Sequence, residues 1–394
     1  MQNYAESAIQ AVIQGETAFC KFLAANDTGK TGAHQYGIYI AKSAFSVLFD
    51  TPGVIGENKD RWERITWNDD FETDNRFVFY GSFGRKTKSE YRITNFGDSF
   101  PFFDVEYTGA LFILVRGYEG CYKGYVLNSE DEIDQFLDAF GMTPAETNRL
   151  ISGHTIRPEA HETVEIDQYI ASLEEAFPSS EEISAAARRI QDAVFDHKEL
   201  IISNPDQKLL EWTDLEFRLF KALEYSRYSD LISRPFDTVD EFVATANQVL
   251  NRRKSRAGKS LEHHLAAIFA GNSLQFQEQA ITEGRKKPDF LFPSQEAYHN
   301  RDYPVEQLMS LAAKTTCKDR WRQVINEADR LRGRPKYLCT LQQGISTAQL
   351  DEMQKEQVIL VVPRPFIVKY PKERQGRIWT LEQFVRFARE VEGL

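Results

Sequence analysis

Two acidic residues and a lysine in the C-terminal third have the types and order that phosphodiester hydrolysis requires. Asp289 opens a short apolar segment, Lys314 ends a second one, and Glu327 follows 13 positions after the lysine. Two carboxylates can hold a divalent ion, and an ammonium group can stabilise charge on an attacked phosphate and orient the water. The three residues therefore predict a Mg²⁺-dependent site with Asp289 and Glu327 as metal ligands.

Taken singly, each residue also has an ordinary structural interpretation, because a Pro-Asp pair often starts a turn and a lysine is usually solvated. Their context favours the site. Residues 290–292 are typical of a strand, and residues 308–313 form an apolar run that delivers Lys314 at its end. Residues 321–331 carry apolar side chains at helical spacing, and Glu327 lies off that stripe.

A cluster of charged residues, Lys318-Asp319-Arg320-Trp321-Arg322, lies between Lys314 and Glu327. It falls where a strand is expected to turn into a helix. Long polar side chains at a helix N-terminus suit phosphates and the base edges of the major groove. The cluster therefore favours DNA as the substrate.

These motifs resemble those of the EcoRII-like (type IIE) restriction endonucleases, which belong to the PD-(D/E)xK nuclease superfamily. The resemblance covers nearly the whole chain and is strongest at residues 251–262, 279–284 and the motifs above. In relatives the second acid lies on the helix after the usual strand, which matches Glu327. Lys318, Asp319 and Arg320 fall where relatives read C/G base pairs. The resemblance implies Mg²⁺-dependent cleavage of both strands at a short GC-containing palindrome, CCWGG-like, by a homodimer.

Two further residues near the motifs are accessory candidates. Glu262 is predicted on a helix beside the basic segment 252–259, where it either joins the metal shell, orients a base contact or is simply solvated. Tyr298 is a weaker candidate, for which a structural role is favoured. The adjacent His263 and His264 cannot both face one site on a helix.

The N-terminal 150 residues mix short strands with glycine-rich turns, a pattern typical of a barrel-like β domain. Strings such as 25–29, 31–35 and 107–111 resemble the effector-binding domain of the same family, a seven-stranded pseudobarrel shared with the plant B-three domain. Positions implicated there in DNA contact are matched by His34, Tyr39, Lys86, Lys88, Glu90 and Arg92. The segment 81–84 is shorter than the family pattern and lacks an arginine expected near Ser82. Arg85 lies close by in the sequence, but the resemblance does not decide whether it replaces that arginine.

Without the resemblance, residues 86–92 are typical of a solvated strand with alternating charges, and His34 of a surface or capped histidine. With it, a second copy of the target site is expected to bind this domain. In the absence of that effector DNA, the domain is expected to cover the catalytic cleft.

The fold class predicted for the chain is a two-domain α+β and α/β protein. We expect an N-terminal β pseudobarrel at 1–150, an acidic linker at 151–178, and a mixed sheet flanked by helices at 179–394, of the restriction-endonuclease type by resemblance. Helices are predicted at 130–140, 206–224, 239–250, 261–269 and 384–391, the last after the capping box that begins at Thr380.

Composition excludes several classes of protein. The chain has 394 residues, a net charge of −11 and 42% hydrophobic residues, as in an ordinary soluble protein. No apolar run reaches the roughly 18 residues of a membrane span, and the start lacks a secretion signal. Four widely spaced cysteines indicate free thiols in the cytoplasm. P-loop, dinucleotide and zinc motifs are not found.

The acidic net charge argues mildly against nucleic acid, but basic clusters at 85–92, 252–259, 285–287 and 318–322 coincide with the motifs. A Mg²⁺-dependent type II restriction endonuclease is the favoured function. The competing hypothesis is a catalytically inactive, sequence-specific DNA-binding regulator that uses only its N-terminal domain. The presence of Asp289, Lys314 and Glu327 argues against it.

Overall fold

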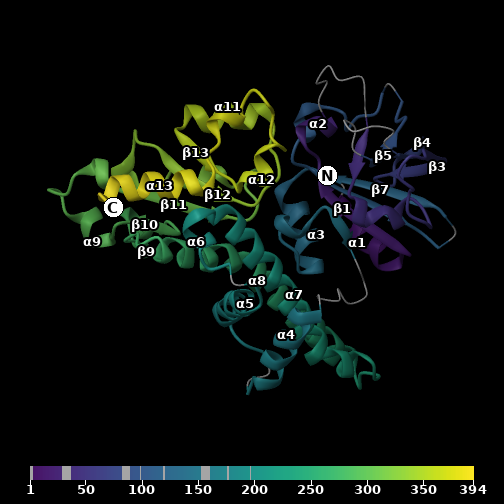
Figure 1. Cartoon of the computed structure of the whole chain (residues 1–394), viewed down its shortest axis with the longest axis horizontal. Coiled ribbons are helices and arrows are strands. Elements are labelled where there is room, and N and C mark those ends of the chain that lie inside the picture. Colours follow the sequence, from purple (N-terminus) through teal and green to yellow (C-terminus); the bar gives the residue numbers. More distant parts are fainter. Residues whose placement is uncertain are drawn as a thin grey trace.

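The protein is represented by a computed structural model that describes residues 3–28, 37–81, 89–97, 99–118, 120–151, 160–174, 177–195 and 197–394. Of the predicted effector-contact residues, His34, Lys86 and Lys88 lie outside the described residues, as do Ser82 and Arg85. Figure 1 shows two sheets at opposite ends of the long axis, with a group of long helices beneath and between them.

The N-terminal sheet is strongly curled and, in the described part of the chain, has eight strands in the order β2-β5-β4-β3-β7-β6-β1-β8. The strands are β1 Thr17–Phe22, β2 Ile38–Ile40, β3 Lys59–Trp67, β4 Phe71–Tyr80, β5 Glu90–Thr94, β6 Leu111–Arg116, β7 Tyr122–Leu127 and β8 Arg149–Ile151. The short β8 pairs with β1 and adds one strand to the seven that the resemblance implies. Trp67 fills the inside of the curl and stacks on Phe112.

Among the described residues, this sheet is accompanied by the helices α1 Tyr4–Gln14, α2 Ala25–Thr28 and α3 Glu130–Phe140. Helix α3 has the predicted bounds. Ser129 caps its N-terminus by accepting from Glu132 N, and Gly141 ends it with φ +67°. Its apolar side packs on α1 and the outside of the sheet through Ile133, Phe136 and other buried residues.

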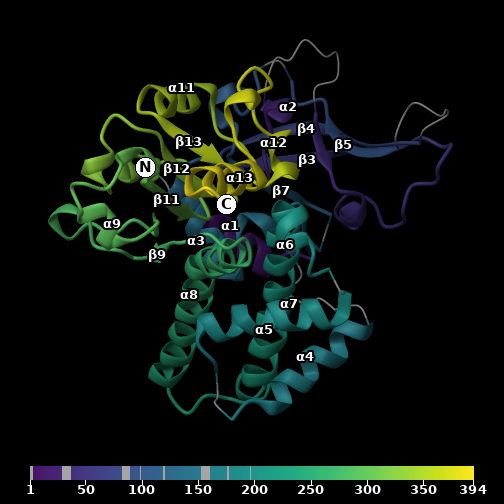
Figure 2. The same cartoon turned by 60° about the vertical axis from the view of Figure 1, so that its left-hand side comes forward.

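The middle of the chain is helical, with α4 Ala160–Ser172, α5 Ser180–Phe195, α6 Leu200–Ser203, α7 Pro205–Ile232 and α8 Val239–Gly271. Part of the predicted linker therefore forms α4, whose Ile166 packs with α5 and α7 in one core. The two helices predicted at 239–250 and 261–269 are wrong as separate elements, because α8 runs unbroken through the basic segment between them. Figure 2 shows α7 and α8 projecting away from both sheets.

The C-terminal sheet has five strands in the order β13-β12-β11-β10-β9 in the described part of the chain. They are β9 Gln277–Glu278, β10 Phe290–Phe292, β11 Met309–Lys314, β12 Lys336–Thr340 and β13 Val358–Val361. The sheet is mixed, since β10 is antiparallel to β11 whereas β12 and β13 continue parallel to it. Helices around it are α9 Gln295–His299, α10 Trp321–Val324, α11 Thr347–Lys355, α12 Arg364–Ile367 and α13 Leu381–Glu392.

The predicted fold class is confirmed by these two sheets and their helices. The capping box at Thr380 is also confirmed, because its side chain accepts from Gln383 N while Gln383 caps Thr380 N in return. The continuous helix predicted at 321–331 is wrong. Helix α10 ends at Val324, and a 3₁₀ turn, Asp329–Leu331, follows after a non-helical Ala328 with φ −148°.

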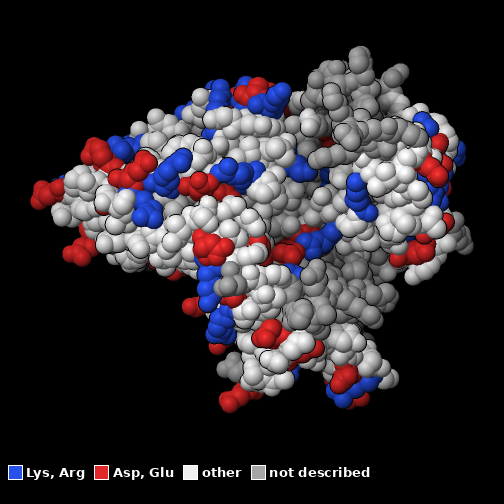
Figure 3. Space-filling view, viewed as in Figure 1, with Lys and Arg blue, Asp and Glu red and all other residues white. Residues whose placement is uncertain are grey.

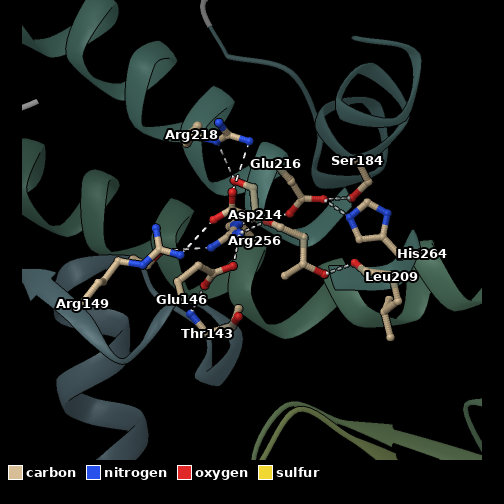
Figure 4. Close-up of polar contacts among 12 residues, drawn as sticks. Thr143, Glu146, Arg149, Ser184, Leu209, Asp214, Glu216, Arg218, Arg256 and His264 are labelled. Carbon is tan, nitrogen blue, oxygen red and sulfur yellow. Dashed lines mark hydrogen bonds and ion pairs between the residues drawn. The ribbon is translucent and has the colours of Figure 1, made fainter. Parts of the chain in front are cut away.

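A buried polar cluster joins the N-terminal sheet region to the long helices (Figure 4). The side chain of Arg256 on α8, 1% exposed, donates to Glu146 Oε1 at 3.1 Å, to Gly141 O at 3.0 Å and to Glu216 Oε1 on α7 at 3.1 Å. Ser184 Oγ and His264 Nε2 lie 2.5 and 3.0 Å from the other oxygen of Glu216. Serine and histidine each contact the carboxylate in the dry interior, so this cluster is structural.

Candidate nuclease active site

Asp289 and Lys314 meet at the ends of two paired strands. Asp289 precedes β10 and Lys314 ends β11, and the antiparallel register of these strands brings the two ends together. Lys314 Nζ donates to Asp289 Oδ2 at 2.9 Å, and Ala313 N donates to the same oxygen at 2.8 Å. The carboxylate is 6% exposed, so it is held rigidly at the edge of the core.

Glu262 approaches the same point from helix α8, which packs against β11. Gln279, just after β9, links the two acids: its Nε2 lies 3.0 Å from Asp289 Oδ1 and 3.4 Å from Glu262 Oε2. Lys259, one turn earlier on α8, donates to Glu262 at 2.8 Å. Of the interpretations left open for Glu262, simple solvation is therefore wrong, since the residue is 9% exposed and faces the Asp289 site.

Glu327 lies in the turn after α10, and the position predicted for it on a helix face is wrong. Thr282 Oγ1 donates to the backbone oxygen of Glu327 at 2.6 Å, which ties this turn to the loop before β10. Burial and the negative charge of Asp289 raise the pKa of Glu327 to about 7, against the opposing effect of Lys314. Glu327 therefore shares the electrostatic environment of the Asp289–Lys314 pair.

The other groups respond to the same crowding of charge. Burial and the charge of Asp289 raise the pKa of Glu262, although Lys259 and Lys314 oppose this. Burial lowers the pKa of Lys314, but attraction to Asp289, Glu327 and Glu262 outweighs burial and the net pKa is raised. Lys314 thus remains a cation among three carboxyl groups.

The donor set suits a hard divalent cation, because carboxylate oxygens are the ligands that Mg²⁺ prefers. The raised pKa values of Glu262 and Glu327 mark a site with more carboxylates than Lys259 and Lys314 neutralise. No three histidine, cysteine or acidic side chains of the described residues already form a ready-made metal cluster.

Tyr298 stands apart from this site, in a neighbouring network. Its hydroxyl lies 2.7 Å from both carboxylate oxygens of Glu283 and accepts from Arg330 N at 3.0 Å. Glu283 in turn accepts from the backbone N–H groups of Asp329 and Arg330. Tyr298 is buried and helps to fix the turn that carries Glu327, as the structural interpretation predicts.

The segment Lys318–Arg320 follows β11 but faces the N-terminal sheet region. Lys318 Nζ donates to Asn128, and the backbone N–H groups of Asp319 and Arg320 donate to Glu130 at the start of α3. The Arg320 guanidinium contacts Glu130 at 2.9 Å and also Asp134. Burial lowers the pKa of Lys318 to about 8. The atoms predicted to read bases are thus already paired within the chain.

Two further contacts lie along the same junction. Gln342 Nε2 donates to Gly109 O at 3.1 Å, and Gln343 Nε2 donates to Pro144 O at 2.6 Å. Sequence analysis missed Asn128, Glu130 and Asp134 as partners of the recognition segment. The acidic run at the start of a capped helix was the available signal, but nothing in the sequence tells which cation such a helix faces.

In the N-terminal sheet, three of the predicted effector-contact residues lie together. Tyr39 on β2 is directly opposite Arg92 on β5, and Arg92 Nε donates to Glu90 Oε1 at 2.7 Å. All three side chains are half-buried. They are therefore neither fully solvated, as an ordinary charged strand would be, nor part of the packed core. Burial, with the charge of Glu90, raises the pKa of Tyr39.

Charged residues of both signs alternate over the face drawn in Figure 3, among the residues that the figure colours. On that face, the basic residues are therefore not gathered in a cleft apart from the acidic residues. Among the described residues, no helix combines the length and the apolar character needed to cross a membrane.

Comparison with known proteins identifies both halves of the chain. Residues 220–385 match the family described as EcoRII C terminal, and residues 12–144 match the family described as restriction endonuclease EcoRII, N-terminal. The type II restriction enzyme EcoRII of Escherichia coli is 38% identical over 95% of this chain and 94% of its own length.

The type II restriction enzyme SsoII of Shigella sonnei is 22% identical over 51% of this chain and 74% of its own length. Among solved structures, a PspGI–substrate DNA complex covers 55% of this chain and 94% of its own chain, with 15% identity and a TM-score of 0.44.

Proposed function

Since the chain belongs to the EcoRII family of type II restriction enzymes and is a DNA-cleaving endonuclease, we propose that it hydrolyses both strands of a short GC-containing palindrome, CCWGG-like, with Mg²⁺ in the cytoplasm. The observation that carries the proposal is the Asp289–Lys314 pair, surrounded by Glu327 and Glu262. A half-buried lysine among three carboxyl groups is poorly explained by stability alone, because charges taken out of water rarely repay their desolvation.

In this proposal Asp289 and Glu327 hold the metal, with Glu262 as a third oxygen donor within reach. When bound, Mg²⁺ supplies a Lewis acid that lowers the pKa of a water and polarises the phosphate. The side chain of Lys314 keeps its proton, places positive charge beside the attacked phosphate and orients the water with its remaining N–H donors. Ala313 N holds the Asp289 carboxylate in place during these steps.

For recognition we propose Lys318, Asp319 and Arg320 as the base-reading residues. They follow β11 within six positions of Lys314, so contact with bases would set the cleavage point relative to the sequence. A guanidinium reads guanine with two donors, and a carboxylate accepts from cytosine. The residue types therefore suit the C/G pairs of the proposed site.

For regulation we propose that the N-terminal domain binds a second copy of the site and otherwise blocks the first. Support comes from Asn128, Glu130 and Asp134, which already occupy the polar atoms of the recognition segment. DNA cannot reach these atoms until α3 leaves. Tyr39, Glu90 and Arg92, with His34, Lys86 and Lys88, are the proposed effector contacts.

The proposed division of the chain is an effector domain at 1–150, a connection at 151–178 and a catalytic domain at 179–394. The connection contains α4, which packs on α5 and α7 rather than hanging free.

We propose a homodimer as the active species, since a palindrome presents two equal half-sites. Support comes from the projecting tip of α7 and α8, where Val239, Phe242, Val243 and Leu250 lie at helical spacing with exposed fractions from 45 to 77%. Light scattering should give a dimer for the wild type and a monomer for Phe242→Asp, whereas Val54→Asp, exposed in the N-terminal region, should remain dimeric.

The test of the catalytic assignment is plasmid cleavage with Mg²⁺ by Asp289→Ala, Lys314→Ala and Glu327→Ala. Each should lose on the order of a hundredfold or more in rate, because each removes a charge used in the transition state. Glu296→Ala, an exposed acid on α9, is the matched control and should cut normally. Failure of the wild type to cut any DNA would favour the inactive regulator instead.

A further inference from the structure

Gln279 is the side chain that joins two acids of the proposed metal site. Asp289 Oδ2 is taken by Lys314 and Ala313 N, whereas Oδ1 accepts from Gln279 Nε2 at 3.0 Å. The same Nε2 lies 3.4 Å from Glu262 Oε2. An ionised carboxylate only accepts hydrogen bonds, so the NH₂ end of the amide must face both acids.

The backbone holds Gln279 in this place. Its N–H donates to Asp289 O at 3.1 Å, and its φ is +49°, a left-handed conformation that a residue with a Cβ seldom adopts. Strain of this kind persists only where the surroundings enforce it, and it gathers at functional sites. The chain thus places an amide donor between two carboxylates at the edge strand of the sheet.

We propose that Gln279 is a positioning residue whose amide stands in for the divalent cation in the metal-free enzyme. Its amide contacts oxygens of Asp289 and Glu262, two acids that would hold the ion, and it would have to move for both oxygens to become free. The inference rests on the proposed metal site and adds Gln279 to it. In the metal-free state the amide keeps the two acids facing one another.

A glutamine with a purely structural role would not compete with a cation for these two acids. Each amide donor stabilises the metal-free state and is given up on binding, so it competes with the ion. Removing the amide should therefore tighten cation binding on the order of tenfold or more, for the loss of one hydrogen bond to a charged group. If Gln279 instead supplied a ligand oxygen, its removal would weaken binding.

The experiment is a titration of the full-length protein without DNA, with Mn²⁺ as the probe and the free ion measured by electron paramagnetic resonance. The variants are Gln279→Leu, and Gln279→Asn, which tolerates the left-handed backbone but is too short to reach both acids. Gln277→Leu is the matched control, because the Gln277 side chain accepts from Gln295 N, away from the acids. Asp289→Ala defines which binding belongs to the site.

Tighter Mn²⁺ binding by both Gln279 variants, with Gln277→Leu unchanged, supports the proposal. Equal or weaker binding by the Gln279 variants overturns it while leaving the metal site intact. If the wild type and Asp289→Ala bind Mn²⁺ alike, the metal site itself is wrong and the inference falls with it.

Discussion

Arg320 uses the same guanidinium to contact the N-terminal region that we propose for reading bases. Its loss would therefore open the enzyme and impair recognition at once. The two effects can be separated by the ratio of cleavage at the cognate site to cleavage at a changed site, because opening changes the cleavage rate of every DNA equally. Recognition changes only the preference for the cognate site.

Arg320→Ala should lower the ratio of cognate cleavage to cleavage at a site with one base pair changed. One bidentate contact discriminates by about 1–3 kcal/mol, so the ratio should fall roughly tenfold to a hundredfold. The control is Arg322→Ala, whose exposed guanidinium contacts Glu352 on α11. An unchanged ratio would reassign Arg320 to phosphate positioning.

Lys318 gives a pH dependence with a defined sign. Burial lowers its pKa from 10.5 to about 8, so between these values the unfolded chain holds more protons than the folded one. Stability contributed by this group therefore rises as pH increases from about 8 to 10.5. Below pH 8, Lys318 is charged in both the folded and the unfolded state, and its burial lowers the stability of the folded protein by the full desolvation penalty.

Calorimetry of Lys318→Met and of the wild type should show this as a difference between their melting temperatures. The variant should be most stable relative to the wild type at pH 7, and that relative advantage should shrink steadily toward pH 10. Lys355→Met, at an exposed position on α11, is the control. A difference that stays constant across this range would contradict the assigned sign.

Asp289 and Lys314 could be singled out from the sequence because a strand pattern begins directly after Asp289 and another ends at Lys314. In the structure, strand pairing brings Lys314 Nζ within 2.9 Å of Asp289 Oδ2. Gln279 and Glu130 could not be found in this way. Their partners lie on other elements, and the packing of those elements against one another is set by tertiary contacts. Such contacts produce no periodic pattern of residues in the sequence.

At the scale of elements, the turn at Glu327 shows why a helical pattern failed. Residues 321–331 have the apolar spacing of a helix, yet Thr282 and Glu283 supply hydrogen-bond partners to Glu327 O and to the N–H groups of Asp329 and Arg330. These side chains replace helical hydrogen bonds after Val324. Tertiary partners thus outweighed a local preference of a few tenths of a kcal/mol per residue.

The loop before β6 meets the loop after β12 through two glycines. A Cβ added to Gly109, which has φ +80°, would lie 2.0 Å from Gly344 O. Real Cβ atoms do not approach backbone so closely, so Gly109→Ala should force the two regions apart. The variant should then cut a single-site plasmid faster than the wild type, toward the rate reached with added effector DNA.

The matched control is Gly97→Ala. Gly97 has nearly the same backbone angle, φ +82°, but nothing lies within 4 Å of its added Cβ. Both variants therefore carry similar backbone strain, but only in Gly109→Ala does the added Cβ clash with Gly344 O. Equal single-site rates for the two variants would show that this contact does not restrain the catalytic domain.

At the scale of the molecule, the regions of the two sheets meet at a polar junction. The junction includes α3 against the recognition segment, the Gly109–Gly344 approach and the Arg256 cluster. The division into two β-containing regions could be predicted from composition, since strand-rich and helix-alternating patterns differ. The junction could not, because complementary polar groups pair only once both folds exist.

A fragment beginning at Phe177 should fold and cut single-site DNA faster than the full chain, since it lacks α3. A cleft covered about 99% of the time would slow the full chain on the order of a hundredfold. The fragment should also be less stable, because Arg256 loses Glu146 and Gly141 O. A fragment beginning at Thr143 keeps Glu146 and should regain part of that stability while remaining fast.

The decisive comparison sets both fragments beside the full chain, with and without a cognate oligonucleotide, on one single-site plasmid. Equal rates for all would leave the N-terminal domain a tether rather than an inhibitor. A soluble but inactive Phe177 fragment beside an active Thr143 fragment would place the domain boundary before Glu146. Only a full chain that is slow alone, yet fast with oligonucleotide, while both fragments stay fast, fits a domain that blocks the site and is removed by effector DNA.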